Sequence, residues 1–357
     1  MTQHTATIIG RSGQPNDYVG VRTHYLLKTF VQNGISARVW DWNLRSSDTT
    51  LDADSIIWLP WVQELNCGWL RLLRCFNGKR YLWTERHDWC EQVRARIMSS
   101  NTCDISPSDV FTYMCYTSLD GVTTWGMQAG HTYWPPLVHT DCLPLIDAAS
   151  ETPTILFDSI WPYRWADGQY TARDTIAALF ESSRLPAGVC AAAIAAHADD
   201  LEPAPLAWAN DIIPNAVAHA LLLERLATSA VYVTTHHELL GLQQFEALAC
   251  GTPVVVARTH APLELLRPGA PGVFVWDIVA PDGAPLPIAE ATENLRAALA
   301  LALAAGSDTA ERAAIKRYHA AAWGADAWWQ RCGSFFTGSN SHRNLDFYEA
   351  LRKITTS

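Results

Sequence analysis

The chain has 357 residues, of which 49% are hydrophobic, and it carries a formal net charge of −10. This length suffices for two domains with a core each, and the acidic balance disfavours a dedicated nucleic-acid-binding protein. No apolar stretch of about 18 residues is free of charge or proline, so the sequence predicts no membrane-spanning helix. Nine scattered cysteines without a Cys-x-x-Cys pair indicate reduced thiols in a cytoplasm and no structural zinc site.

Strands and helices are predicted in alternation through the first half. An apolar run that ends in glycine, at residues 5–10, predicts the first strand. Apolar positions at helical spacing from Val21 to Phe30 predict a helix that ends at Asn33-Gly34. Further strands are expected at 37–42, 54–59 and 80–84, with a helix at 70–76. This alternation is typical of a parallel, doubly wound sheet.

The same alternation restarts after a proline-punctuated stretch at 135–152, which indicates a linker. Strands are expected at 154–157, 187–196, 230–235, 253–257 and 272–276, with helices at 171–182, 215–227, 243–249 and 288–305. We therefore predict an α/β protein of two Rossmann-like domains, residues 1–148 and 149–335, that face each other across a cleft. Residues 336–357 are expected to form a helix that packs back on the first domain.

The stretch from Ala230 to Ala257 carries the clearest chemistry. A buried strand leads into a loop that contains Gly241, a helix that opens near Leu242, and a second strand. In open α/β sheets, the loops at the carboxyl ends of the strands bind ligands, and helix N–H groups suit a phosphate. Glu246, one turn into the helix, can accept hydrogen bonds from ribose hydroxyls, and Glu238 can reach a sugar hydroxyl.

The spacing of Glu238 and Glu246 in this stretch resembles that of the retaining glycosyltransferases of family 4. Gly241-Leu242 lies between the two glutamates, and Glu-Ala-Leu-Ala-Cys-Gly-Thr-Pro-Val-Val begins at the second. The resemblance implies the GT-B fold, a first glutamate near the transferred sugar and a second that holds the ribose. The alternative is an ordinary strand–helix–strand unit with two surface glutamates. In that case the loop, the spacing of the glutamates and the flanking strands would occur together by chance.

A weaker similarity covers the loop after the first strand of the second domain. The family has an arginine there and, five residues on, a lysine, which together neutralise the donor diphosphate. Aligned on Pro162, these positions hold Ser159 and Arg164, and Asp158 replaces the usual glycine. The missing cation would cost about 1.5–3 kcal/mol of binding unless Arg258 or an arginine of the other domain substitutes.

Single positions elsewhere also resemble the family. Glu264 lies where a glutamate opens the next helix, and Gly20 lies, before the first helix, where a glycine backbone faces the donor phosphates. His87 falls one residue later than a histidine close to the transferred sugar; the alternative is a loop histidine beside Asp88. The resemblance implies Glu238 and His87 as catalytic residues, and neither a metal nor a cofactor.

A basic stretch from Arg71 to Arg96 has seven basic residues against three acids. One interpretation is a solvated helix face. The other is an acceptor site, with Arg86, Trp89 and Arg94 as candidate contacts. A small molecule or a glycan is the expected acceptor, and a hydroxymethylated base in viral DNA is the alternative.

Together these observations predict transfer of a sugar from a nucleoside diphosphate to an acceptor hydroxyl, with retention of anomeric configuration. Catalysis would depend on the positioning of donor and acceptor and on stabilisation of the charge that develops on the leaving diphosphate. An alternative of another class is a catalytically silent GT-B protein that binds a nucleotide or a partner, which the loss of the arginine at Ser159 supports. An epimerase or a phosphorylase on the same fold is a third alternative. We expect a cytoplasmic, metal-independent enzyme.

Overall fold

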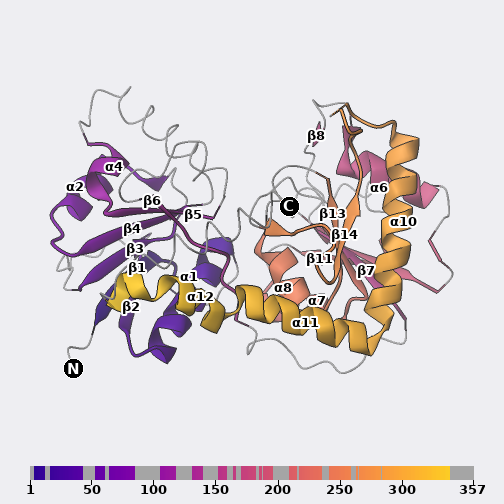
Figure 1. The fold of residues 1–357 in the computed structure, drawn as a ribbon. Helices are drawn as coiled ribbons and strands as arrows, with labels where there is room; N and C mark the ends of the chain where they lie inside the picture. Colours follow the sequence, from indigo (N-terminus) through magenta and orange to yellow (C-terminus); the bar gives the residue numbers. More distant parts are fainter. Residues whose placement is uncertain are drawn as a thin grey trace. The chain divides into compact units, whose positions relative to one another are not determined.

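The chain divides into two compact units, Met1–Leu137 with Ala325–Ser357, and Val138–Gly324. Each unit contains a parallel sheet (Figure 1). No helix in the described part of the chain is long and apolar enough to cross a membrane. The computed structural model describes residues 4–12, 17–42, 53–60, 64–84, 105–117, 131–139, 152–158, 164–165, 170–181, 185–186, 188–195, 209–214, 217–234, 241–258, 263, 265–282 and 284–337.

The sheet of the first unit has six parallel strands in the order β2-β1-β3-β4-β5-β6. These are β1 (Thr5–Gly10), β2 (Ser36–Asp41), β3 (Ser55–Trp58), β4 (Lys79–Thr84), β5 (Tyr113–Tyr116) and β6 (His131–Tyr133). β1 and β3 are buried along almost their whole length, as strands of a parallel sheet covered on both faces are. The doubly wound parallel sheet predicted here is confirmed.

Five helices of the first unit are described: α1 (Tyr18–Gln32), α2 (Cys67–Arg74), α4 (Pro107–Val110), α12 (Ala325–Cys332) and α13 (Ser334–Thr337). The carboxylate of Asp17 caps α1 and accepts a hydrogen bond of 2.7 Å from the backbone N–H of Gly20. Gly20, which was predicted to precede this helix, is its third residue. The predicted end at Asn33-Gly34 is confirmed, with φ of 75° at Gly34.

Aromatic side chains fix the C-terminal helices to the first unit. Trp328 of α12 stacks on Trp83, with ring centroids 5.6 Å apart, and meets Trp134 edge-on. The hydroxyl of Tyr81 donates a hydrogen bond of 2.8 Å to the carbonyl of Phe335, and burial raises the pKa of this hydroxyl. These contacts explain why the chain returns to the first unit at α12.

The division between the units therefore lies earlier in the chain than the predicted boundaries at 148 and 335. The returning segment begins at Ala325, where α12 starts, and not at 336. α13 ends at Thr337, and the rest of the helix predicted at 336–357 lies outside the described residues.

The sheet of the second unit also has six parallel strands, in the order β11-β10-β7-β12-β13-β14. These are β7 (Thr154–Phe157), β10 (Cys190–Ala195), β11 (Asp211–Pro214), β12 (Val231–Thr234), β13 (Val254–Ala257) and β14 (Val273–Trp276). The order reverses between β7 and β12, which is the Rossmann arrangement. A short antiparallel pair, β8 (Arg164–Trp165) and β9 (Tyr170–Thr171), follows β7 along the chain.

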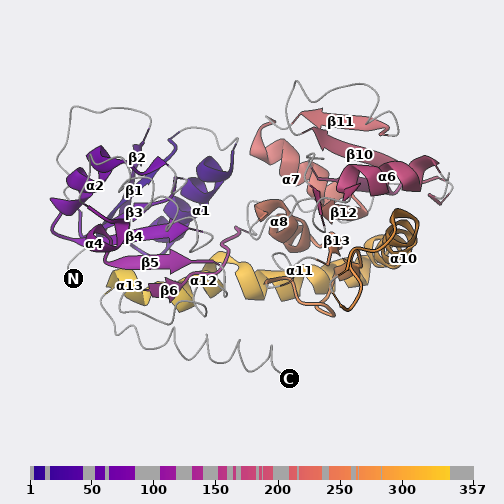
Figure 2. The same ribbon diagram turned by 90° about the horizontal axis from the view of Figure 1, so that it is seen from above.

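Helices cover both faces of this second sheet (Figure 2). α6 (Ala172–Glu181) and α10 (Ile288–Ser307) share a core with alternate residues of β7, β10, β12 and β13. α7 (His219–Thr228) and α8 (Leu242–Cys250) pack on the other face, and α11 (Thr309–Trp323) packs on α8. The alternation predicted for this half is confirmed.

The cysteines do not all behave as the sequence suggested. Cys67, the first residue of α2, is disulfide-bonded, and its partner lies outside the described residues. The expectation that all nine thiols are reduced is therefore wrong at Cys67. The free cysteines of the described ranges are Cys75, Cys115, Cys190, Cys250 and Cys332.

The Gly251-Thr252 pair locks α8 to its neighbours. Gly251 ends α8 in a left-handed conformation with φ of 87°, and a Cβ there would lie 2.5 Å from the carbonyl oxygen of Arg312. The hydroxyl of Thr252 donates a hydrogen bond of 2.7 Å to Leu226 of α7. The buried guanidinium of Arg312, on α11, donates bonds of 2.8 Å to Ser229 and 3.1 Å to the Thr252 hydroxyl. Three helices are thus joined at this turn.

We expect Gly251→Ala to destabilise the fold more than Gly269→Ala. Both glycines have a positive φ, which costs an alanine about 1–2 kcal/mol, but a Cβ at Gly269 would meet no atom within 4 Å. At Gly251 the contact with Arg312 adds about 1–3 kcal/mol of overpacking. Urea denaturation of the two variants measures the difference. Equal losses of stability would contradict the packing described for this turn.

Candidate functional site

The strand order reverses between β7 and β12, and the carboxyl ends of these strands mark a candidate site. In open α/β sheets, ligands bind at this position. Asp158 directly follows β7; its side chain is buried, and its backbone N–H donates a hydrogen bond of 2.9 Å to Val233 of β12. Gly241 and Leu242, the predicted donor-binding pair, stand after β12 at the start of α8.

Within the described residues, two helices begin at this edge without a side-chain cap. α7 follows β11 with Ala218 at its N-cap, and α8 follows β12 with Gly241 at its N-cap. Neither helix has an acidic residue in its first turn. The first N–H groups of a helix carry a partial positive charge and accept an anion readily. The edge thus offers two helix starts with the electrostatics that suit a phosphate.

Glu246, the predicted ribose residue, lies in the second turn of α8 and is almost completely buried, at 1% exposure. Its Oε1 lies 2.7 Å from Nε2 of His219, which is the first residue of α7 and 8% exposed. In the tautomer of His219 that carries its proton on Nε2, the imidazole donates this hydrogen bond to the carboxylate. The pair joins the starts of the two helices.

Two glutamines complete the start of α8. Gln243 accepts a hydrogen bond of 2.9 Å from the hydroxyl of Tyr232, a residue of β12. The side chain of Gln244 is buried beside Gly241, and its Nε2 has no hydrogen-bond partner within the described residues. A buried amide nitrogen without a partner is costly, so it is a further donor available to a ligand at this helix start.

Similar folds occur among solved structures. Anabaena Alr3699/HepE, in complex with UDP and glucose, matches with a TM-score of 0.59 and 12% identity over 94% of this chain and 100% of that chain. An alpha-glucosyltransferase in complex with UDP and a 13-mer DNA containing a HMU base matches with a TM-score of 0.59 and 11% identity, over 94% of this chain and 100% of that chain. WaaG, a glycosyltransferase involved in lipopolysaccharide biosynthesis, matches with a TM-score of 0.57 and 11% identity, over 94% of this chain and 100% of that chain. The chain has the GT-B fold.

At these identities the likeness shows the GT-B fold alone, and the activity has to be argued from the site. No protein-family model matches the sequence, and no curated protein matches it.

Most of the other predicted site residues are not described. The following lie outside the described residues: Glu238, His87, Ser159, Glu264, Arg86, Trp89 and Arg94. For Arg164, only the backbone in β8 is described. Gly20 belongs to the first unit, and its N–H is already bonded to Asp17. The structure therefore brings together Gly241, Leu242 and Glu246 and leaves the other assignments as predictions.

Arg258 was considered as a substitute for the missing cation. It follows β13 at the carboxyl edge of the sheet and forms an ion pair with Asp277. Both side chains are nearly half exposed, so this pair contributes little stability and can be exchanged for another anion. Arg258 is thus compatible with the role considered for it.

The described part of the basic stretch, residues 71–84, contains four basic residues of two kinds. Lys79 donates a hydrogen bond of 2.7 Å to the carbonyl of Phe335, at α13. Arg80 donates bonds of 3.4 Å to carbonyls in the last turn of α2. Lys79 and Arg80 therefore bond to backbone carbonyls, and Arg71 and Arg74 are exposed on α2.

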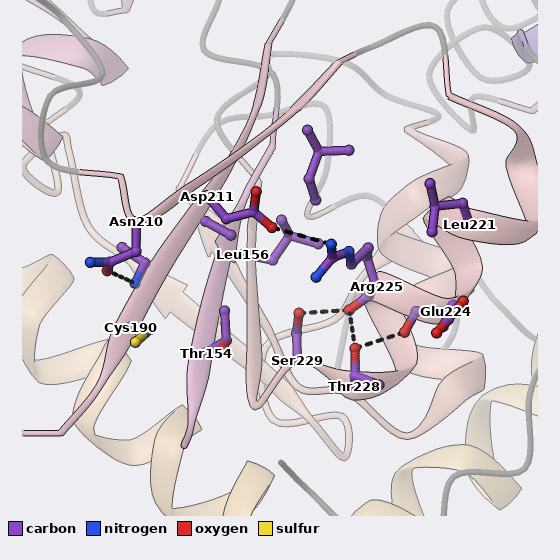
Figure 3. A pocket seen from close by; sticks show the side chains of 13 residues that line it. Thr154, Leu156, Cys190, Asn210, Asp211, Leu221, Glu224, Arg225, Thr228 and Ser229 are labelled. Atoms are coloured by element: carbon purple, nitrogen blue, oxygen red, sulfur yellow. Dashed lines mark hydrogen bonds and ion pairs between the residues drawn. The ribbon is translucent and has the colours of Figure 1, made fainter. Parts of the chain in front are cut away.

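A cavity of about 520 Å³ lies elsewhere in the second unit, between β10, β11 and α7 (Figure 3). Its lining includes the first residues of three strands, Thr154, Cys190 and Asp211, and Asp211 forms an ion pair of 3.3 Å with Arg225. Because these strands are parallel, their first residues lie at the edge opposite the candidate site. The cavity is separate from that site.

Two residues of the candidate site, His219 and Gln244, were not predicted from the sequence. His219 is 27 residues from Glu246, and nothing in the local pattern connects them. Gln244 lies in the stretch from Ala230 to Ala257, and the available signal was a polar residue in a helix whose other residues are mostly apolar.

We expect Cys250, the last residue of α8, to resist alkylation in the native protein. Burial raises the pKa of its thiol to about 12, and the nearby carboxylate of Glu246 adds to this shift. The reactive thiolate is therefore scarce at pH values near 8. Iodoacetamide labelling followed by peptide mass spectrometry should modify the exposed Cys75 and spare Cys250. Labelling in urea is the control, and native labelling of Cys250 as fast as that of Cys75 would contradict the packing of α8.

Proposed function

We propose that this chain transfers a sugar from a nucleoside diphosphate to an acceptor hydroxyl, with retention at the anomeric carbon. The observation that carries the proposal is the β12–α8–β13 unit, which holds Glu246 beside two uncapped helix starts at the strand-order reversal. A nucleoside diphosphate has the two features this edge suits, an anionic diphosphate and a ribose diol. The complex of HepE with UDP and glucose, on the same fold, agrees with this choice.

The transfer needs little beyond positioning and charge stabilisation. The bond between the anomeric carbon and the phosphate oxygen breaks, and its electron pair leaves with the diphosphate. The acceptor oxygen forms the new bond to the same face of the carbon, and its proton goes to the leaving phosphate. The starts of α7 and α8 would stabilise the charge that develops on the diphosphate, with Arg164 and Arg258 as additional cations.

Each remaining residue has a proposed role in this reaction. Glu246 would accept hydrogen bonds from the ribose, and Glu238 would bind a hydroxyl of the transferred sugar. His87 would lie near the same sugar, on the acceptor side. We propose that the enzyme works in the cytoplasm and without a metal, on a small molecule or a glycan.

A catalytically silent GT-B protein is the rival from another class. The observation in its favour is Asp158, a buried carboxylate at the end of β7, where it would repel a diphosphate. A silent protein would bind a nucleotide and release no product, so binding and turnover must be measured separately.

We expect one of the UDP-, GDP- or ADP-sugars to stabilise the chain against heat and to be cleaved on incubation. A ligand at a hundred times its Kd adds about 2.7 kcal/mol of stability, which a thermal melt detects. Glu246→Gln keeps the size of the side chain and should weaken nucleotide binding about tenfold. Glu238→Ala should bind the nucleotide and lose sugar transfer.

Chelation with EDTA is a control for the metal-independent mechanism and should change the turnover less than about twofold. Stabilisation by a donor with no nucleotide release in the wild type would favour the silent protein. Absence of binding by all three classes of donor would contradict the proposal itself.

A DNA acceptor is the second candidate, favoured by the neighbour that holds a 13-mer DNA and by the two exposed arginines on α2. With a net charge of −10, we expect no binding of a duplex with hydroxymethylated bases at low salt. Filter binding at increasing salt tests this. Tight binding that falls steeply with salt, and that Arg71→Glu with Arg74→Glu abolishes, would favour DNA instead.

A further inference from the structure

Glu246 is an unusually buried carboxylate for a residue that should meet a polar ligand. At 1% exposure, an ionised carboxylate loses most of its hydration, and burial is tolerated only when the charge is paired and hydrogen-bonded. The structure gives it His219, at 2.7 Å. A separation this short is typical of a charge-assisted hydrogen bond.

The two helices that carry this pair are held in fixed positions. Thr252, just after α8, donates a hydrogen bond of 2.7 Å to Leu226 of α7, and Arg312 bonds to both segments. Phe245, next to Glu246, packs edge-on against Trp323 of α11, with ring centroids 5.5 Å apart. These contacts hold the backbone that carries His219 and Glu246 in place. The imidazole of His219 therefore has a fixed position and determines the orientation of the Glu246 carboxylate.

A free glutamate side chain has three rotatable bonds and loses up to about 2 kcal/mol of entropy when it is held in place. A glutamate held before the ligand arrives has already lost that freedom, so more of the contact energy appears as affinity. We propose that His219 is a positioning residue of the donor site, whose Nε2–H bond to Oε1 orients the carboxylate of Glu246 for the ribose diol. The inference rests on the proposed function and adds to it a residue outside the Glu238–Glu246 stretch.

The experiment compares three variants with two ligands. His219→Phe keeps a ring of similar size and removes the donor, whereas His219→Gln retains an N–H near the position of Nε2. His319→Gln is the matched control, because His319 is also buried in the second unit and bonds a carbonyl, that of Pro271, at 2.8 Å. The ligands are UDP and 2′,3′-dideoxy-UDP, replaced by the matching pair if GDP or ADP is the nucleotide that binds.

Calorimetric titration should show that His219→Phe lowers the affinity for UDP by about tenfold to a hundredfold. Its affinity for the dideoxy analogue should change by less than about threefold, since that ligand lacks the groups that Glu246 contacts. His219→Gln should restore most of the preference for UDP, and His319→Gln should keep it. In a transfer assay, His219→Phe should raise the donor KM more than it lowers kcat.

Each failure has a distinct signature. If the wild type binds no nucleoside diphosphate, the proposed function and this inference fall together. If the wild type prefers UDP over the dideoxy analogue and His219→Phe keeps that preference, the inference alone is overturned. An equal loss of affinity for both ligands in His219→Phe would also overturn it, because it would indicate general damage to the unit.

Discussion

The direction of the strands is the constraint on which the rest of this molecule depends. All strand pairs in the two six-stranded sheets are parallel, so every strand of a sheet ends at the same edge and the following helix starts there. In the second unit this brings the starts of α7 and α8 together next to the reversal between β7 and β12. Their partial charges, Glu246 and His219 all follow from that arrangement.

The buried strands of the fold could be predicted from the sequence, and the edge strands could not. β12 is buried at each of its four positions, and its apolar run ended close to where it was expected. β11 was missed because it is exposed at three of four positions and ends in Pro214, features of an edge strand that leave no apolar run. α12 was missed because it is only eight residues long, too short for the helical spacing of Ala325, Trp328 and Cys332 to stand out, although Trp328 is fully buried.

The positions of the candidate-site residues could be predicted within one continuous segment, and not where two separate segments meet. Gly241, Leu242 and Glu246 lie on a single strand–loop–helix unit, so their spacing placed them correctly on α8. His219 comes from the previous helix, and only the packing of α7 on α8 makes it a neighbour. Trp83 and Trp134, by contrast, are core residues that pack edge-on against each other.

The stretch from Ala230 to Ala257 contains two kinds of residue, and the difference bears on whether the chain binds a ligand. Gly251 and Thr252 join α7, α8 and α11, so a protein that needed only the fold would need them. Glu246 and His219 also join α7 to α8, but apolar residues in place of a buried polar pair of this kind are often neutral or stabilising, by about 1–4 kcal/mol. A buried carboxylate at an uncapped helix start is thus better explained by a ligand than by stability. That argument favours a nucleotide site over a scaffold that binds no nucleotide.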